Sequence, residues 1–297
     1  MTVVSNASPS NVKQPLLEVS ELTVDVYGED SIRRVVHGVD FALFAGKTLA
    51  IVGESGSGKS LTANAIMGIL PDVAVARGRT LYNGVDLLSL NSKEREAVNG
   101  PQIGYIFQEP MSALHPTMTI AEQMVRPMRK HLKISKQTAR KRASELLELV
   151  GIPPERNVMQ SYVHQLSGGM RQRVMIAMSI SCEPALLIAD EPTTALDATI
   201  QKQILDLIDR LRDELGLALI LISHDLGLVS NHADDILVML DGEVMELGPT
   251  SSVLKNPESP YTAGLLAAAP RIGFKQDRLP VICLLYTSDA ADDIALV

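Results

Sequence analysis

Tryptophan is absent from this sequence, and aromatic residues of all kinds make up only 3% of its 297 residues. Cysteine is also scarce, because Cys182 and Cys283 are the only two. Two cysteines cannot build a disulfide framework, and this pair lacks the CxxC spacing of a metal site. The composition therefore excludes a small disulfide-stabilised secreted fold and favours a reducing cytoplasm.

Long apolar runs are missing too. The longest, residues 215–222, is far shorter than the roughly 20 residues that a membrane-spanning helix needs. Residues 1–15 contain neither a basic start nor an apolar core, so we interpret them as a loose leader rather than a secretory signal. We expect a chain that does not span a bilayer.

An excess of positive charge is also lacking, since the formal net charge is −8 and the isoelectric point is near 5.3. No overall field would draw such a chain to nucleic acid or to anionic lipid, although a local basic patch remains open. Hydrophobic residues reach 46%, and the chain is long enough to bury a large core. The sequence therefore predicts a globular protein with no nucleic-acid partner.

Two kinds of strand pattern succeed one another along the chain. Residues 17–27 and 35–43 alternate between apolar and polar, which predicts half-exposed antiparallel strands. Nearly continuous apolar runs at 48–52, 185–189 and 217–222 instead predict parallel strands that helices cover on both faces. We expect an α/β fold in which a mostly parallel sheet, flanked by helices, follows an N-terminal antiparallel β subdomain.

Helical patterns fill the middle of the chain, at residues 120–131 and 135–149. They predict an inserted helical subdomain at about 110–180. Near the other end, Asp241-Gly242 lies between two short apolar runs and suits the type I′ turn of a hairpin. We expect this hairpin to close the core and a short helical extension to follow it.

A glycine-rich segment after the first apolar run fits the pattern G-x-x-x-x-G-K-[ST]. Backbone N–H groups of such a loop surround phosphates, the lysine reaches the β and γ phosphates, and the last hydroxyl meets magnesium. The predicted nucleotide-binding residues are Gly53, Glu54, Ser55, Gly56, Ser57, Gly58, Lys59, Ser60 and Leu61. Lys59 is also a predicted catalytic residue, and Ser60 is a predicted magnesium ligand. A chance lysine in a glycine-rich turn would not explain why a strand precedes the motif and a helix follows it.

A second phosphate-binding pattern lies downstream, where Ser167, Gly168 and Gly169 precede a helix-forming stretch. Serine is a good helix cap, and the unpaired N–H groups at a helix start attract anions. One nucleotide hardly needs two such sites on one subunit. We therefore hypothesise that these three residues bind a nucleotide held by another subunit.

Polar residues follow three of the predicted strands. Asp190 would hold magnesium through water, and Glu191 would orient and deprotonate an attacking water. Gln108 follows the strand pattern at 103–107 and would touch magnesium and water, and His224 would reach the γ-phosphate. A solvated acidic turn, a loop amide and a structural histidine are the simpler alternatives, which the shared position at strand ends disfavours. The predicted catalytic set is thus Glu191, His224, Lys59 and Gln108, and the predicted metal ligands are Ser60, Gln108 and Asp190.

These motifs, in this order and rough spacing, resemble the ATP-binding cassette (ABC) ATPases over about residues 16–280. The resemblance implies a P-loop ABC ATPase core that binds ATP and Mg²⁺ and works as a head-to-tail dimer. It also implies that Asp197 contacts the opposite subunit and that Tyr27 stacks on adenine. Asp197 could instead only support the helix that follows it, and Tyr27 could be a core or edge tyrosine.

Three further stretches, at 108–116, 170–178 and 256–262, resemble the ATPase subunits of peptide and nickel importers. The resemblance implies an ATPase domain at 16–256 and a truncated C-terminal extension of the oligopeptide-transporter type at 257–282. It further implies a homologous ATPase subunit and two transmembrane permease subunits as partners, and indirectly an extracytoplasmic solute-binding protein. The chain would then sit peripherally on the cytoplasmic face of the inner or plasma membrane.

Residues 283–297 fit this pattern poorly, because they resemble translated junction sequence. We interpret them as an atypical, artefactual tail, in which Cys283 alone could not build the iron–sulfur site of some relatives.

Two other functions remain as alternatives to an importer ATPase. Soluble ABC ATPases that act on DNA or ribosomes usually carry a long coiled-coil insertion or two cassettes, and this sequence shows neither. A non-hydrolysing regulatory module is disfavoured because the catalytic set is complete.

Overall fold

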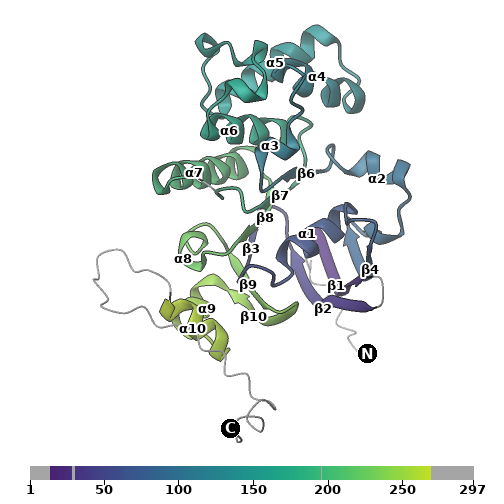
Figure 1. Cartoon of the computed structure of the whole chain (residues 1–297), viewed down its shortest axis with the longest axis vertical. Coiled ribbons are helices and arrows are strands. Elements are labelled where there is room, and N and C mark those ends of the chain that lie inside the picture. The colour runs from purple at the N-terminus through teal and green to yellow at the C-terminus, as the bar shows by residue number, and fades with distance from the viewer. Residues whose placement is uncertain (1–13, 29–30, 195, 269–297) are drawn as a thin grey trace, which may run out of the picture.

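The computed structural model describes residues 14–28, 31–194 and 196–268, and Figure 1 shows how their elements are arranged. Nearly all of the predicted leader, the end of the C-terminal extension and the whole atypical tail lie outside the described residues.

A mostly parallel sheet forms the centre of the fold. Within the described residues it has the strand order β10-β9-β3-β8-β7-β6, in which every neighbouring pair is parallel except β9 and β10. The strands are β3 (Thr48–Gly53), β6 (Ile103–Ile106), β7 (Leu186–Asp190), β8 (Ala218–Ser223), β9 (Asp235–Leu240) and β10 (Glu243–Pro249). All residues of β3, β6, β7 and β8 are buried, as continuous apolar runs predict.

A separate antiparallel sheet lies beside this centre, at the lower right of Figure 1. Its order is β2-β1-β4-β5, with strands β1 (Leu17–Tyr27), β2 (Ile32–Leu43), β4 (Ala74–Tyr82) and β5 (Val85–Asp86). The expected antiparallel subdomain and its first two strands are confirmed. Strands β4 and β5 were not predicted.

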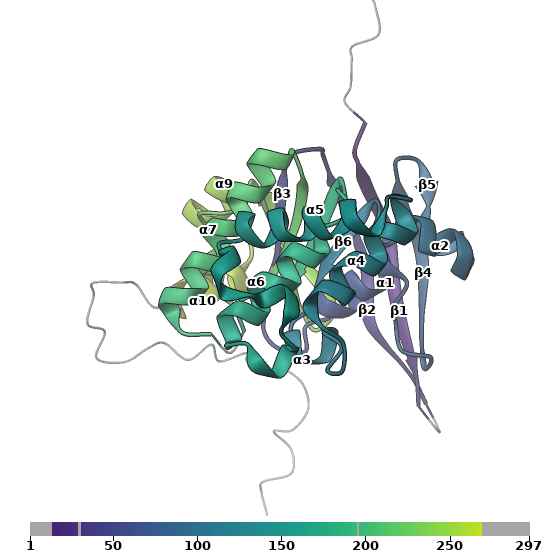
Figure 2. The same cartoon turned by 90° about the horizontal axis from the view of Figure 1, so that it is seen from above.

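The two faces of the mostly parallel sheet belong to two different hydrophobic cores, because successive side chains of a strand point to opposite faces. Leu49 and Ile51 of β3 join a core with the antiparallel sheet and helix α1 (Lys59–Met67). Ala50 and Val52 join the other core, which the remaining large helices cover. Figure 2, seen from above, shows helix α1 between the two sheets and the helical layer on the other side.

The helical layer occupies the top of Figure 1. It contains α3 (Pro110–Ala113), α4 (Ile120–His131), α5 (Lys136–Leu149) and α6 (Gly168–Ser179), with short 3-10 turns at Pro154–Arg156, Val158–Gln160 and Val163–Gln165. Helix α4 has the predicted bounds, and α5 begins one residue later than the predicted pattern. Helix α2 (Ser92–Val98), which connects to the antiparallel sheet through the turn Leu87–Ser89, was not predicted.

The C-terminal part begins with α7 (Ala198–Leu215) and α8 (Leu226–Val229) and ends with α9 (Thr250–Lys255) and α10 (Pro260–Ala268). Between them, β9 and β10 form the predicted hairpin, whose turn residues Asp241 and Gly242 have φ values of 46° and 84°. Positive φ at both positions is what a type I′ turn requires. Among the described residues, no helix combines the length and apolar character needed to cross a membrane.

Gly104 allows close packing between β6 and helix α6. A Cβ at this position would lie 2.4 Å from the carbonyl oxygen of Ser179 and 3.1 Å from Cδ1 of Leu187. Gly104→Ala should therefore lower the free energy of unfolding by about 1–3 kcal/mol, as overpacking typically does. Urea denaturation would measure this change.

Gly168→Ala is the matched control for this substitution. Its Cβ would meet nothing closer than 3.8 Å, and alanine favours a helix more than glycine does. Unchanged stability of Gly104→Ala would contradict the close packing described here.

Candidate nucleotide-binding and catalytic site

The parallel register brings four strand ends to one edge of the sheet. Val52 of β3 pairs with Ser223 of β8, and Asp190 of β7 pairs with Ile222 of the same strand. On the far side, Ile106 of β6 pairs with Ala189. The glycine-rich loop, Gln108, Glu191 and His224 each follow one of these ends, so the predicted site residues converge from four strands.

At two positions the backbone of the glycine-rich loop adopts a conformation that favours glycine. Gly53 has φ 155°, and a Cβ there would lie 2.1 Å from the carbonyl oxygen of Met239 on β9. Gly58 has φ 94° and stands at the start of helix α1, which has no side-chain cap. The first N–H groups of α1 thus have no capping side chain and are available to an anion.

The β9–β10 hairpin turn supports this loop. The Gly242 N–H donates to the carbonyl oxygen of Ser57 at 3.1 Å, and the Gly242 carbonyl accepts from the His37 N–H of β2 at 2.9 Å. A Cβ on Gly242 would lie 2.4 Å from the carbonyl oxygen of Val35, so the turn packs tightly on that strand. The hairpin therefore connects the loop to the antiparallel sheet.

Lys59 is buried, with 4% of its surface exposed. Its ammonium group donates to the carbonyl oxygens of Gly53 at 2.9 Å and Glu54 at 2.7 Å. Burial lowers the pKa of Lys59, and the negative charges of Glu191 and Asp190 oppose this change. The loop thus holds a desolvated cation at its centre, where it would interact strongly with an anion.

Ser60 and Asp190, two of the predicted magnesium ligands, are in direct contact. The Ser60 hydroxyl donates to Oδ1 of Asp190 at 2.8 Å, and the Tyr105 hydroxyl, a donor between two acceptors, lies 3.0 Å from Oδ2 of Asp190 and 2.9 Å from Oδ1 of Asn64. Burial raises the pKa of Asp190, and the hydrogen bonds from Ser60 and Tyr105 counteract it. Tyr105 was not predicted as a site residue.

Glu191 stands at the centre of a second cluster. Its Oε2 accepts from the Gln108 amide at 3.0 Å and from the Thr194 hydroxyl at 2.9 Å, and it lies 3.4 Å from Nδ1 of His224. Glu191 also has φ 43°, which is a strained conformation for this residue type and costs of order 1–3 kcal/mol. Such strain is concentrated at functional sites, and the hydrogen bonds from Gln108 and Thr194 hold the carboxylate there.

Among the described residues, no hydrogen bond joins Ser167, Gly168 or Gly169 to the glycine-rich loop. Ser167 caps helix α6, because its hydroxyl accepts from the Met170 N–H at 3.4 Å, as predicted. Gly168 is exposed, has no left-handed φ, and would place a Cβ 3.8 Å from its nearest neighbour. Nothing within the described residues therefore requires glycine at this position. Gly168 and Gln108 both line a cavity of about 370 Å³.

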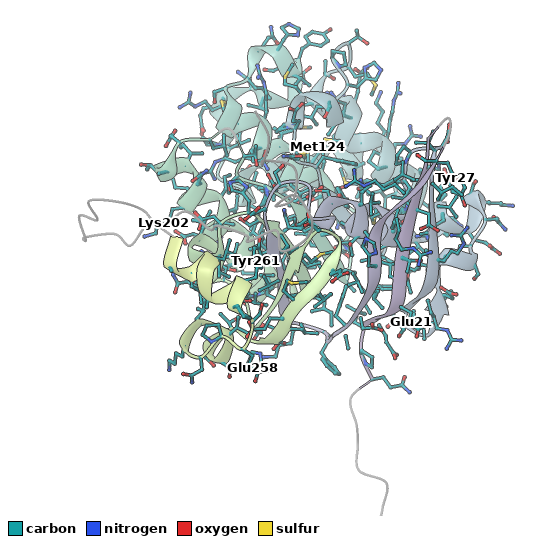
Figure 3. All side chains as sticks on the ribbon, turned by 60° about the horizontal axis from the view of Figure 1, so that its bottom comes forward. Glu21, Tyr27, Met124, Lys202, Glu258 and Tyr261 are labelled. Carbon is teal, nitrogen blue, oxygen red and sulfur yellow. The ribbon has the colours of Figure 1, made fainter. Side chains whose placement is uncertain are left out.

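Asp197 and Tyr27 lie apart from these clusters. Asp197 caps helix α7, since its Oδ1 accepts from the Ile200 N–H at 3.0 Å, which is the helix-supporting role considered for it. Tyr27 lies at the end of β1, at the right of Figure 3, and its hydroxyl accepts from the Arg77 guanidinium at 2.9 Å. Contact of Asp197 with another subunit, and of Tyr27 with adenine, stay predictions.

Three residues near the site were not predicted as site residues, although Tyr261 lies in the stretch 256–262 that resembles the importers. Tyr105 and Thr194 are recognisable only from their contacts with Asp190 and Glu191. Tyr261 of helix α10, labelled in Figure 3, is 7% exposed, and its hydroxyl completes no hydrogen bond within the described residues. Burial and the neighbouring Glu54 carboxylate raise the pKa of Tyr261, so the C-terminal helix reaches the glycine-rich loop.

Comparison with known proteins agrees with this geometry. Residues 36–194 match the family described as ABC transporter. The chain belongs to this family. Residues 245–283 also match the oligopeptide/dipeptide transporter C-terminal region. This family and the similarity to solved ABC cassettes show that the protein binds nucleotide and hydrolyses ATP. They also confirm the predicted P-loop ABC fold.

Two curated relatives are similar over most of their length. The oligopeptide transport ATP-binding protein OppD of Bacillus subtilis is 50% identical over 260 residues, which are 86% of this chain and 72% of that protein. The dipeptide transport ATP-binding protein DppD of the same organism is 46% identical over 261 residues, 87% of this chain and 78% of that protein. A solved dimeric cassette, MJ0796 bound to ADP and phosphate, superposes with a TM-score of 0.70 at 27% identity, covering 79% of this chain and 98% of that one.

Tyr105→Phe should lower the free energy of unfolding of this ABC ATPase by about 1.5–3 kcal/mol, because the buried Asp190 carboxylate loses a donor. Tyr82→Phe is the matched control, since its hydroxyl donates to the uncharged carbonyl of Gln102 at 3.2 Å. That loss should be about 0.5–1.5 kcal/mol. Thermal or urea denaturation measures both, and equal losses would show that the charge of Asp190 does not matter.

Proposed function

We propose that this chain is the ATP-hydrolysing subunit of a multisubunit membrane importer of peptides or of a related small solute such as nickel. The match of residues 245–283 to the oligopeptide/dipeptide transporter C-terminal region carries this proposal. The names of the relatives, which are oligopeptide and dipeptide transport ATP-binding proteins, support it. The chain would work at the cytoplasmic face of the inner or plasma membrane.

The glycine-rich loop fits the phosphates of ATP. Gly53 and Gly58 let the backbone pass where a Cβ would collide, and the uncapped start of helix α1 offers N–H groups to anions. Lys59 adds a buried positive charge beside them. The other residues of the loop, Glu54, Ser55, Gly56, Ser57, Ser60 and Leu61, would contribute through their backbone.

The neighbouring oxygen donors fit Mg²⁺. Ser60 and Asp190 offer a hydroxyl and a carboxylate 2.8 Å apart, and Gln108 adds an amide beside Glu191. Hard cations prefer such oxygen ligands and keep several waters of their own. Bound there, Mg²⁺ would neutralise phosphate charge as hydrolysis proceeds.

Glu191 would act as the general base of the hydrolysis. Its carboxylate is held by Gln108 and Thr194, and it faces the ring of His224. This arrangement leaves one acceptor oxygen, Oε1, free of these contacts, and that oxygen would take the proton from water. His224, whose side chain is 61% exposed, would contact the γ-phosphate.

Ser167, Gly168 and Gly169 would complete the site of a second ATPase subunit in a head-to-tail dimer. The exposure of Ser167 and Gly168 and the open space around Gly168 support a surface that another molecule approaches closely. Asp197, exposed at the start of helix α7, would add a contact at the same interface. The partner could be a second copy or a homologous chain.

Two transmembrane permease subunits are the other proposed partners, and an extracytoplasmic solute-binding protein would deliver the solute to them. The segment after Gln108 would contact a permease subunit. The reported relatives are transport proteins and give no support to the alternative of a soluble ATPase that acts on DNA or ribosomes. A regulatory module that does not hydrolyse ATP is disfavoured by the complete cluster around Glu191.

Glu191→Gln should keep ATP binding but lower turnover by about 10²–10⁴-fold, because the amide cannot take a proton. Steady-state ATPase assays and equilibrium nucleotide binding measure the two effects. Glu214→Gln, which changes an exposed carboxylate on helix α7, is the control and should leave both unchanged. Near-normal hydrolysis by the Glu191 variant would remove that residue from the catalytic role.

Gly168→Asp should lower dimer-dependent hydrolysis by roughly tenfold or more, because it places a negative charge against the nucleotide of the partner. Binding of ATP to the variant's own loop should change little, and an acidic residue at the start of α6 should not destabilise the helix. Gly168→Ala is the control, because it removes the glycine without adding a negative charge. Full turnover by the Asp variant would argue against a shared site.

A further inference from the structure

Positive charge is concentrated in one short segment of this acidic protein. Residues 126–142 contain eight lysines and arginines and no aspartate or glutamate, although the whole chain has a net charge of −8. The segment covers the end of helix α4 and the first half of α5, at the top of Figure 1. The local field there is therefore opposite in sign to that of the molecule as a whole.

Four of these cations line one cavity of about 400 Å³ between α4 and α5. They are Arg126, Arg129, Lys136 and Arg140, and all four are exposed to solvent. Glu122 is the only acidic residue among the lining residues. Its carboxylate accepts hydrogen bonds from the Thr119 N–H at 3.0 Å and the Thr119 hydroxyl at 3.1 Å, so it mainly closes the start of α4.

Three of the other four cations of the segment have acidic partners, and only Lys133, which does not line the cavity, forms no ion pair among the described residues. Lys130 pairs with Glu96, Lys141 with Glu145 at 3.7 Å, and Arg142 with Glu183 at 2.6 Å. Among the described residues, none of the four cations that line the cavity forms an ion pair within 4.0 Å. The cavity therefore holds four positive charges against the single negative charge of Glu122, whose pKa is lowered by its hydrogen bonds with Thr119 and further by Arg126 and Lys136.

The position of Lys136 increases this imbalance. It is the first residue of α5, at the positive end of the helix dipole, and no acidic residue occupies the first turn. A cation at this end of a helix is unfavourable by itself, and Arg140 follows one turn later on the same face. A bound anion would convert this repulsion into attraction.

We propose that this cavity, lined by Arg126, Arg129, Lys136 and Arg140, is a binding site for a phosphate-bearing anion with at least two negative charges. Three guanidinium groups can each bind phosphate oxygens through two parallel hydrogen bonds, which an ammonium cannot do. The cavity has four cations and one carboxylate, so a ligand with a single negative charge would leave most of its positive charge unneutralised. The volume suits a phosphorylated headgroup or a small soluble polyphosphate.

The first experiment measures binding of inorganic pyrophosphate by calorimetry in Lys59→Ala, which weakens competing phosphate binding at the glycine-rich loop. Arg126→Ala with Arg140→Ala should weaken pyrophosphate binding by about tenfold or more, since charged hydrogen bonds are lost. Lys133→Ala with Lys141→Ala is the matched control, because it removes the same charge from exposed residues that do not line the cavity. Its affinity should stay within about twofold.

A second measurement uses the unsubstituted chain and does not depend on the folding of any variant. Pyrophosphate should slow hydrogen exchange of amides at the end of α4 and the start of α5. A further arm compares vesicles of phosphatidylcholine alone with vesicles that contain cardiolipin. Recruitment to cardiolipin that is lost in the cavity variant would identify a lipid headgroup as the source, whereas pyrophosphate binding without recruitment would identify a soluble phosphate.

Three results would overturn the proposal. If both double variants weaken pyrophosphate binding equally, the attraction is non-specific. If pyrophosphate gives no protection from hydrogen exchange and neither pyrophosphate nor cardiolipin binds, no site exists. Binding of polyglutamate without binding of the phosphate probes would point to an acidic protein segment instead. Basal ATPase activity, measured with each pair of substitutions in the chain that retains Lys59, should be the same for both pairs, so this test is independent of the proposed transport function.

Discussion

The parallel register of β3, β8, β7 and β6 is the constraint on which the site depends. Parallel neighbours end at the same edge of a sheet, so residues that are far apart in sequence meet there. Ser60 and Asp190, separated by 130 positions, form a hydrogen bond because β3, which leads into the loop and helix α1, and β7, which ends at Asp190, are held in this order. A slip of one residue in β7 would turn Asp190 to the opposite face and break this contact.

The glycine-rich loop depends on a second contact, with the β9–β10 hairpin. Gly53 passes Met239 so closely that no other residue fits, and the Gly242 N–H supports the Ser57 carbonyl. The same turn accepts a hydrogen bond from His37 of the antiparallel sheet. One two-residue turn of the mostly parallel sheet therefore contacts both the glycine-rich loop and the antiparallel sheet, and it holds the three together.

Much of this arrangement could be predicted from sequence because its signals are local. Continuous apolar runs identified β3, β7 and β8, and Asp241-Gly242 identified the hairpin. Strand β4 was missed because residues 74–82 include two arginines and a glycine, and only pairing with β1 makes them a strand. Tyr105 was missed for a related reason: its hydrogen bond to Asp190 spans 85 positions and exists only once β6 has paired with β7.

The polar groups of the site are already satisfied by one another, and this affects how the ATPase would begin its cycle. Lys59 directs its ammonium at Gly53, Glu54 and Ser57, which accounts for all three of its donors. A phosphate that takes this lysine must therefore replace carbonyl partners. The exchange is favourable because the ammonium group replaces neutral carbonyl partners with an opposite charge, whose Coulombic attraction is strong at a buried site. The loop can thus keep a buried cation stable and still release it to an anion, whereas an isolated buried ammonium would lose its proton.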